Sequence, residues 1–126
     1  MRAAVFHEHG PFENLRIETL PDPEITADQV LVRVKAVSLN GFDPMVMRGI
    51  PGLRTPLPMV PGADIAAEIV ELGANVRNGP FRKGQRVAVI PNRDDGMMGE
   101  TMRVGLGKYF AVHPEFPLQK PDKVSY

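Results

Sequence analysis

The sequence predicts a mainly β domain, a sandwich or partly open barrel of short strands with one or two short helices. The first observation is a period of two. In QVLVRVKAVSL, residues 29–39, apolar and charged side chains alternate as they do in a half-buried strand. The second observation is the spread of thirteen prolines and twelve glycines along the 126 residues, where they mark turns rather than one linker. Short strands joined by such turns are typical of sandwiches and open barrels.

The N-terminal part contains three predicted strands. Residues 2–6 (RAAVF) and 14–21 (NLRIETLP) are two of them, and the sequence EHGPFE between them favours a turn. The third is the stretch 29–39, which has one buried and one solvated face. Its buried face is predicted to hold Val30, Val32, Val34 and Ala36.

A short helix is predicted at residues 42–49, FDPMVMRG. Asp43 suits the N-cap, Pro44 suits the first helical position and Gly49 suits the end of the helix. This spacing allows two turns at most, so the helix is a small addition to a β fold.

More strands are predicted after the helix. DIAAEIVEL, residues 64–72, is largely apolar on both faces, which predicts a central strand buried on both sides. Residues 85–90 (QRVAVI) and 108–113 (KYFAVH) are two further strands, and ETMRV at 100–104 is another candidate.

Composition excludes several classes of protein. Fifteen basic and fifteen acidic residues cancel, so no basic surface for nucleic acid or an anionic membrane is expected. The chain contains no cysteine, which excludes disulfides and thiolate metal sites. No stretch approaches the roughly 20 apolar residues of a membrane helix, and the N-terminus does not resemble a signal peptide. A single cytoplasmic domain is the expectation.

Two glycine patterns are similar to nucleotide-binding motifs, but neither matches its motif completely. Gly105 and Gly107 lack the third small residue and the following helix of a dinucleotide fingerprint. Gly79 and Gly84 have P-loop spacing, yet Gln85 follows where a lysine is required. The serines have no nucleophile-elbow context.

Histidines and methionines form two further groups of candidates. His7 and His9 could hold a metal but have no evident third ligand, so solvated histidines at a hairpin are the favoured interpretation. The methionines are expected to be core packing, with a pliable lining for flat apolar ligands as the alternative. They are Met45, Met47, Met59, Met97, Met98 and Met102.

Polar side chains follow the strand 29–39 at the point where it ends. Asn40 and Asp43 flank Gly41 and Phe42, and polar groups at the end of a scaffold strand are well placed to meet a ligand. The alternative is that Asn40 is a turn residue and Asp43 only an N-cap. Asp64, which a Pro-Gly turn delivers to the start of an apolar strand, raises the same question.

Several stretches, in this order, resemble the N-terminal substrate-side domain of medium-chain dehydrogenases/reductases, whose fold is similar to the GroES co-chaperonin. They are MRAAVFHEHGPFENLRIETLPDP, VLVRVKAVSLNGFDPMVMRG, PMVPGADIAAEIVELGANV, FRKGQRVAV and KYFAVHPEFPLQKPDKVS. The resemblance covers nearly the whole chain, residues 1–126. It implies a GroES-like, partly open β-barrel.

Within that family the sequence most resembles the zinc-independent quinone oxidoreductase branch. Zinc alcohol dehydrogenases have a cysteine ligand where this chain has Asn40, and His-Glu where it has Ala63 and Asp64. A neutral amide is a poor zinc ligand and a methyl group is none. The resemblance therefore implies no metal site, with Asp64 a hydrogen-bonded residue near the substrate.

The activity implied by the resemblance is hydride transfer from NADPH, or NADH, to a quinone, an enone or a carbonyl compound. It implies that Asn40 and Asp43 serve catalysis and contact the cofactor, Asp43 either orienting Asn40 or touching the cofactor or substrate. It places Phe42, Met45, Arg48 and Asp64 beside the substrate. Two insertions depart from the family spacing, at Asn78 to Pro80 and at Asn92 to Thr101, and the second is expected to shape the substrate pocket.

The cofactor-binding Rossmann domain of the family has no counterpart in these residues. The chain is therefore expected to be a fragment that neither binds NADPH tightly nor turns over substrate alone, and that self-associates through uncovered apolar surface. Two alternatives stay open: a stand-alone, non-catalytic GroES-like binding module, and a zinc alcohol dehydrogenase relative with a rearranged metal site.

Overall fold

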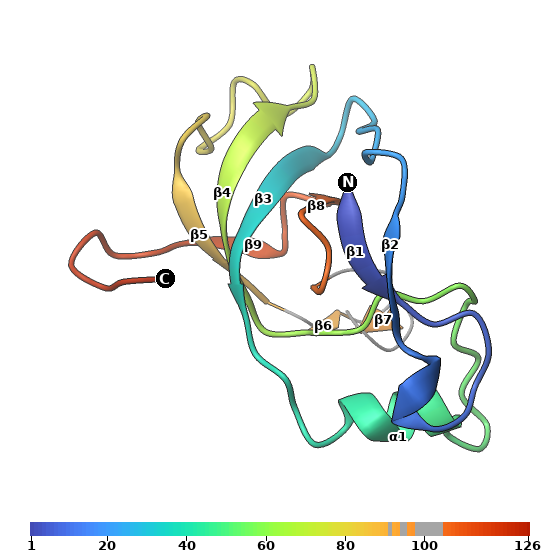
Figure 1. Ribbon diagram of the computed structural model, residues 1–126. Coiled ribbons are helices and arrows are strands. Elements are labelled where there is room, and N and C mark those ends of the chain that lie inside the picture. Colours follow the sequence, from blue (N-terminus) through green and yellow to red (C-terminus); the bar gives the residue numbers. More distant parts are fainter. Residues whose placement is uncertain (91, 94–95, 98–104) are drawn as a thin grey trace.

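The computed structural model describes residues 1–90, 92–93, 96–97 and 105–126, and these form a mainly β domain (Figure 1). The elements in chain order are β1 Arg2–Val5, the 3-10 helix η1 Phe12–Asn14, β2 Arg16–Thr19, β3 Val30–Val37, α1 Asp43–Arg48, β4 Ile65–Leu72, β5 Arg86–Val89, β6 Asn92–Arg93, β7 Gly96–Met97, β8 Tyr109–Val112 and β9 Pro117–Gln119. The predicted fold class, mainly β with a short helix, is confirmed.

The central sheet has five antiparallel strands in the order β8-β3-β4-β5-β9. Two smaller sheets, β1-β2 and β6-β7, accompany it. The described strands do not close into a complete barrel, in agreement with a partly open one. Figure 1 shows β3 and β4 as the long curved centre of the sheet, with α1 beyond one end of it.

Six of the predicted strands lie within the described residues, and all six form and match to within two residues at each end. The candidate at 100–104 lies outside the described residues. The sequence analysis missed the two-residue strands β6 and β7 and the strand β9, and η1 occupies part of the predicted turn after β1. β9 is only three residues long and begins with a proline, so it has neither the length nor the alternation of a recognisable strand.

The buried face of β3 is shorter than predicted. Val30 and Val32 are fully buried, but Val34 is only half-buried and Ala36 is exposed. The pairing of β3 with β4 shifts register between Val34 and Ala36, and a β-bulge of this kind interrupts the alternation of side chains. The core therefore ends near the middle of the strand.

β4 is central in the sheet, as predicted, but it is not equally buried on both sides. Ile65, Ala67 and Ile69 are buried, whereas the side chains between them are only half-buried. The prediction of two fully buried faces is therefore wrong, because only one face of this sheet covers the main core.

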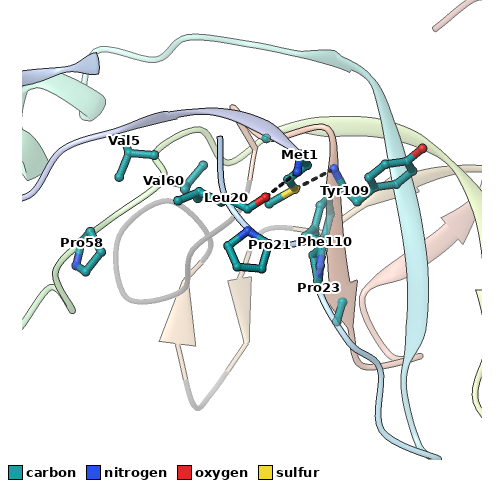
Figure 2. Close-up of a pocket in the computed structure, with 11 residues that line it drawn as sticks. Met1, Val5, Leu20, Pro21, Pro23, Pro58, Val60, Tyr109 and Phe110 are labelled. Carbon is teal, nitrogen blue, oxygen red and sulfur yellow. Dashed lines mark hydrogen bonds between the residues drawn. The ribbon is translucent and has the colours of Figure 1, made fainter. Parts of the chain in front are cut away.

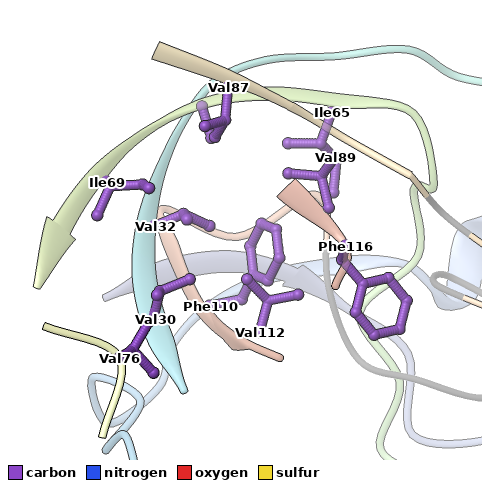
Figure 3. Packing of buried hydrophobic residues seen from close by; sticks show 11 residues of the cluster. Val30, Val32, Ile65, Ile69, Val76, Val87, Val89, Phe110, Val112 and Phe116 are labelled. Carbon is purple, nitrogen blue, oxygen red and sulfur yellow. The ribbon is translucent and has the colours of Figure 1, made fainter. Parts of the chain in front are cut away.

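The main core lies on the inner face of the five-stranded sheet (Figure 3). Side chains from four of its strands converge with Phe116, from the turn before β9, and Val76, from the loop after β4. Burial of such aliphatic and aromatic side chains is the dominant favourable term in folding. The buried members drawn in Figure 3 include Val30, Val32, Ile69, Val87, Phe110 and Val112.

A second cluster, Phe6, Val46, Met47 and Met59, joins the end of β1 to the inner side of α1. Met47 and Met59 are buried in it, which confirms packing as their role. Met45 is 55 % exposed, and nothing is described of the Met97, Met98 and Met102 side chains.

The C-terminal residues fold back against the sheet. The buried Lys120 ammonium donates hydrogen bonds to the carbonyl oxygens of Pro121, at 2.9 Å, and Val124. The Tyr126 ring has the cationic groups of Arg86 and Lys120 each 5.3 Å from its centre, a distance at which cation–π attraction operates.

No helix among the described residues has the length and apolar character needed to cross a bilayer.

Candidate functional site

The candidate site forms where β3 ends and β4 begins. Val37 pairs with Ile65 in the antiparallel ladder, so the residues just beyond them also meet. The Ser38 amide donates a hydrogen bond of 3.0 Å to the Asp64 carbonyl oxygen. This extension of the ladder brings Asp64 beside Asn40, which is 24 positions earlier in the sequence.

Asp64 holds the side chain of Asn40. The Asn40 Nδ2 group donates to Asp64 Oδ2 at 2.7 Å, a short distance that suits a charge-assisted hydrogen bond. The Ser38 hydroxyl lies 3.2 Å from the same carboxylate oxygen and 3.3 Å from Asn40 Oδ1. A hydroxyl has one proton, so Ser38 donates to one of these acceptors at a time. The cluster is open to solvent, since Asp64 and Ser38 are exposed.

Asp43 holds the backbone of Asn40 from the opposite direction. It is only 5 % exposed, and its Oδ2 atom accepts a 2.7 Å hydrogen bond from the Asn40 backbone N–H. Its Oδ1 atom accepts the Gly62 backbone N–H at 3.2 Å. One buried carboxylate therefore joins the end of β3 to the turn that precedes β4.

Asp43 is not the N-cap of α1, which corrects the sequence analysis. The helix begins at Asp43 itself, Phe42 is the N-cap, and no side chain makes a capping hydrogen bond there. The Asp43 carboxylate instead binds backbone N–H groups outside the helix. Pro44 at the start and Gly49 at the end, with φ +90°, are where the sequence predicts them.

The outer side of α1 carries two of the predicted substrate-binding residues. Met45 and Arg48 are exposed, while Phe42 is half-buried and packs against the cluster of Phe6, Val46, Met47 and Met59. Phe42 thus lies at the border between that cluster and solvent. The predicted pocket-shaping residues at Asn92 to Thr101 lie largely outside the described residues.

His7 and His9 are exposed, as the favoured interpretation predicts, and each also has a partner in the protein. His7 Nε2 lies 2.9 Å from Glu18 Oε1, an interaction across the β1-β2 hairpin. His9 Nδ1 lies 3.2 Å from the carbonyl oxygens of Val46 and Met47, in the last turn of α1. Both carbonyl oxygens also accept backbone N–H groups, from Gly49 and Gly10, so His9 adds a further contact at the end of α1.

The structure brings together three of the predicted residues, Asn40, Asp43 and Asp64, and adds Ser38, which sequence reasoning missed. The available signal for Ser38 was its alternation with Asn40 along an extended segment, which places two side chains on one side. The contribution of the Gly62 backbone has no side-chain signal, so sequence analysis could not find it.

The donor set does not suit a catalytic zinc ion. Asn40 offers a neutral amide, which is a poor zinc ligand, Ala63 offers only a methyl group, and Asp64 is already hydrogen-bonded. Among residues 1–90 and the other described segments, no three His, Cys, Asp or Glu side chains are grouped to hold a metal.

Comparison with known proteins agrees with this fold. The family model described as "Alcohol dehydrogenase GroES-like domain" matches residues 26–122. The chain is similar to the chloroplastic NADPH-dependent alkenal/one oxidoreductase of Arabidopsis thaliana, with 30 % identity over 128 aligned positions, covering 100 % of the chain and 32 % of the relative. It is also 37 % identical to an NAD-dependent alcohol dehydrogenase of Sulfolobus acidocaldarius. That alignment covers 76 % of this chain and 28 % of the relative.

Solved structures agree with the sequence comparisons. The quinone oxidoreductase from Coxiella burnetii superposes with a TM-score of 0.83 and 30 % identity, covering 99 % of this chain and 38 % of that one. The chain spans about a third of the length of the curated relatives that it matches. On the family match and these alignments, the chain belongs to the alcohol dehydrogenase GroES-like domains of the medium-chain dehydrogenase/reductase family.

Proposed function

We propose that the chain is the substrate-side domain of a zinc-independent, NAD(P)H-dependent oxidoreductase that reduces a quinone, an enone or another carbonyl compound. The observation that carries the proposal is the Asn40 amide, held by Asp64 through its side chain and by Asp43 through its backbone. The names of the alkenal/one and quinone oxidoreductases among its relatives support the substrate class.

Asn40 is the residue assigned to the substrate oxygen. Its Nδ2 group has two hydrogens, and Asp64 accepts one of them. The second can donate to a carbonyl oxygen on which negative charge develops during reduction. A donor that is already oriented stabilises that charge without reorganisation during the reaction. Asp64 thus fixes the amide in place, and the Ser38 hydroxyl can donate a second hydrogen bond to the same carboxylate.

Asp43 acts through Asn40 in this proposal. Both of its oxygens already accept backbone N–H groups and the side chain is buried, which favours a positioning role over direct contact with cofactor or substrate. Phe42, Met45 and Arg48 line the substrate side, the first with a half-buried ring and the others from the exposed face of α1.

The bound nicotinamide cofactor would supply the hydride. The chain itself is predicted to contribute only a contact of Asn40 toward it, with Asp43 holding Asn40 in position, since no glycine fingerprint for a dinucleotide occurs in the sequence. We therefore propose that the cofactor is held by a Rossmann domain of a longer parent protein. The preference for NADPH and a cytoplasmic location stay predictions, and the Arabidopsis relative is named chloroplastic.

The test is a nuclear magnetic resonance titration of the 126-residue chain with cyclohex-2-enone. Millimolar enone should shift the backbone amides of Ser38, Asn40 and Gly62 in a saturable way, and Asn40→Ala should abolish these shifts. The matched control is Asn75→Ala, because Asn75 makes the same 2.7 Å amide–carboxylate hydrogen bond to Asp28 away from the site.

Three results would count against the proposal. They are unchanged enone shifts in Asn40→Ala, an equal loss in Asn75→Ala, and a stoichiometric zinc ion in the purified protein. NADPH, titrated separately, should bind weakly. Sub-micromolar binding to the isolated chain would contradict the assignment of the cofactor to another domain.

A further inference from the structure

A cavity of about 370 Å³ lies between the start of β1, the segment that follows β2, and β8 (Figure 2). Its wall includes Val5 from β1 and Phe110 from β8, and Val60 from the segment before β4. Neither Asn40 nor Asp64 is among its lining residues. The cavity is therefore separate from the candidate functional site.

Part of the wall of this cavity belongs to paired strands. Val5 and Phe110 are 1 % and 4 % exposed, and their strands are paired to neighbouring strands. Pro21, Pro23 and Pro58 supply three further rings with fixed backbone φ. A cavity whose wall is already ordered loses little conformational freedom when a ligand enters, which favours binding.

The N-terminus closes one side of the cavity. The Met1 ammonium donates to the Leu20 carbonyl oxygen and lies 2.9 Å from Asp22 Oδ1, so its charge is compensated. The Met1 sulfur accepts the Tyr109 backbone N–H at 3.4 Å, which ties the N-terminus to β8 (Figure 2).

The chemistry of the wall selects an uncharged ligand. Aliphatic, proline and aromatic side chains form it, and its lining among the described residues includes no Asp, Glu, Lys, Arg or His side chain. An apolar space of this kind offers water few hydrogen-bond partners, so a compact apolar molecule can displace that water at little cost. Its volume lies at the lower end of the roughly 300–1,000 Å³ typical of small-molecule sites.

We propose that this cavity is a binding site for a small, uncharged cyclic molecule with an aromatic or alicyclic ring. The alternative of an added polypeptide strand is disfavoured, because Pro21, Pro23 and Pro58 lack the N–H groups that strand pairing needs. The proposal is independent of the reaction assigned to Asn40.

The test uses 4-fluorotoluene as the probe, observed by its ¹⁹F signal, with the 126-residue chain. Saturable binding with a Kd below about 1 mM is expected. The charged analogue 4-fluorobenzoate should bind at least about tenfold more weakly, because transfer of a carboxylate into an apolar space is costly. Backbone amide shifts should centre on Val5, Val60 and Phe110.

A cavity-filling variant provides the second arm. Ala111→Leu places extra side-chain volume at a half-buried lining position and should weaken 4-fluorotoluene binding at least about tenfold. Ala88→Leu is the matched control, since Ala88 is exposed on β5 and does not line the cavity. If circular dichroism shows that Ala111→Leu does not fold, Val60→Leu replaces it.

The proposal is overturned by any of four results: binding that does not saturate, equal affinity for 4-fluorobenzoate, unchanged affinity in the folded cavity-filling variant, or shifts centred on Asn40 and Asp64. Loss of probe binding as the chain dimerises would identify a second copy as the occupant and would also overturn it.

Discussion

At the scale of single residues, the two carboxylates beside Asn40 have different surroundings. Asp64 is exposed and its carboxylate holds an amide side chain, whereas Asp43 is buried and accepts two backbone N–H groups. A buried polar group without a partner costs about 1–3 kcal/mol, so the paired arrangement at Asp43 matters for stability as well as for position.

A third carboxylate, Glu68, lies between two cations. It faces Arg33 across the β3-β4 pair, with 3.1 Å between Arg33 Nη2 and Glu68 Oε1, and Lys35 Nζ lies 3.3 Å from Oε2. Burial by itself would raise the pKa of Glu68, but the hydrogen bond from Lys35 and the charge of Arg33 outweigh it. The pKa of Glu68 is therefore below the ordinary value of 4.5.

Glu68→Gln is predicted to destabilise the protein in a pH-dependent way. A carboxyl group with a lowered pKa in the folded state stabilises the fold above its unfolded pKa, and this contribution is lost as pH falls through the folded pKa. The difference from the natural protein should be about 0.5–1 kcal/mol near pH 7 and should disappear as pH falls progressively below 4.5.

Urea unfolding at a series of pH values measures this difference. Glu71→Gln, the same substitution at an exposed position of the same strand, is the control for the loss of a charge. A difference for Glu68→Gln that stays constant from pH 7 to pH 3 would contradict the assigned pKa direction.

Residues of the site differ in how readily the sequence predicts them. Asn40, Asp43 and Asp64 were predictable because they stand at the positions of a family pattern. Ser38 was missed since its role depends on the pairing of Val37 with Ile65, which no local pattern encodes. The N-cap role predicted for Asp43 was wrong because the helix begins at Asp43 itself, and its carboxylate accepts N–H groups outside the helix, one of them from the distant Gly62.

At the scale of elements, alternation predicted strand positions well and burial less well. β3 and β4 lie where the period of two places them, but a β-bulge and a half-open outer face reduce their burial. β9 depends on its pairing with β5 rather than on its own sequence. Burial and edge pairing are tertiary properties, and a single sequence does not reveal them.

Two glycines allow the turn before β4 to contact the turn before β8. Gly62 and Gly105 have φ of +98° and +76°, values that favour glycine. A Cβ atom on Gly105 would lie 2.3 Å from the Gly62 carbonyl oxygen, so the two backbones meet without room for a side chain. The neighbouring Leu106 N–H donates to the Pro61 carbonyl oxygen at 2.9 Å.

Gly105→Ala is predicted to destabilise the protein more than Gly52→Ala. Both positions have positive φ, which costs alanine roughly 1–2 kcal/mol, but a Cβ on Gly52 meets nothing within 4 Å. The backbone clash at Gly105 should add about 1–3 kcal/mol. Thermal and urea unfolding of both variants measure this, and equal destabilisation would rule out the close contact.

At the scale of the whole molecule, β2 is an open edge of the β1-β2 sheet. β1 has partners on both sides, since Ala3 bridges to Gly107 as well as pairing with Glu18. β2 pairs only with β1 among the described strands, and its Ile17 is 64 % exposed. An exposed edge strand with an apolar side chain is a template for pairing with another chain.

Self-association through this edge is the prediction at this scale. Antiparallel pairing of two copies centred on Ile17 sets Arg16 opposite the partner's Glu18, so the charges are complementary. Sedimentation velocity should show concentration-dependent dimers that Ile17→Lys abolishes. Leu39→Lys, at an equally exposed apolar residue outside the strands, should leave them unchanged. A clean monomer at millimolar concentration would contradict the prediction.

The Asp43 carboxylate has one more consequence, for how such a domain can change its selectivity. The buried Asp43 carboxylate accepts the backbone N–H groups of Asn40 and Gly62. The position of Asn40 therefore does not depend on which side chains occupy the outer surface of α1. Under the proposed function, holding the substrate oxygen and selecting the shape of the substrate are therefore tasks of different residues. Substitutions at Met45 and Arg48 are then expected to change substrate selectivity without moving Asn40.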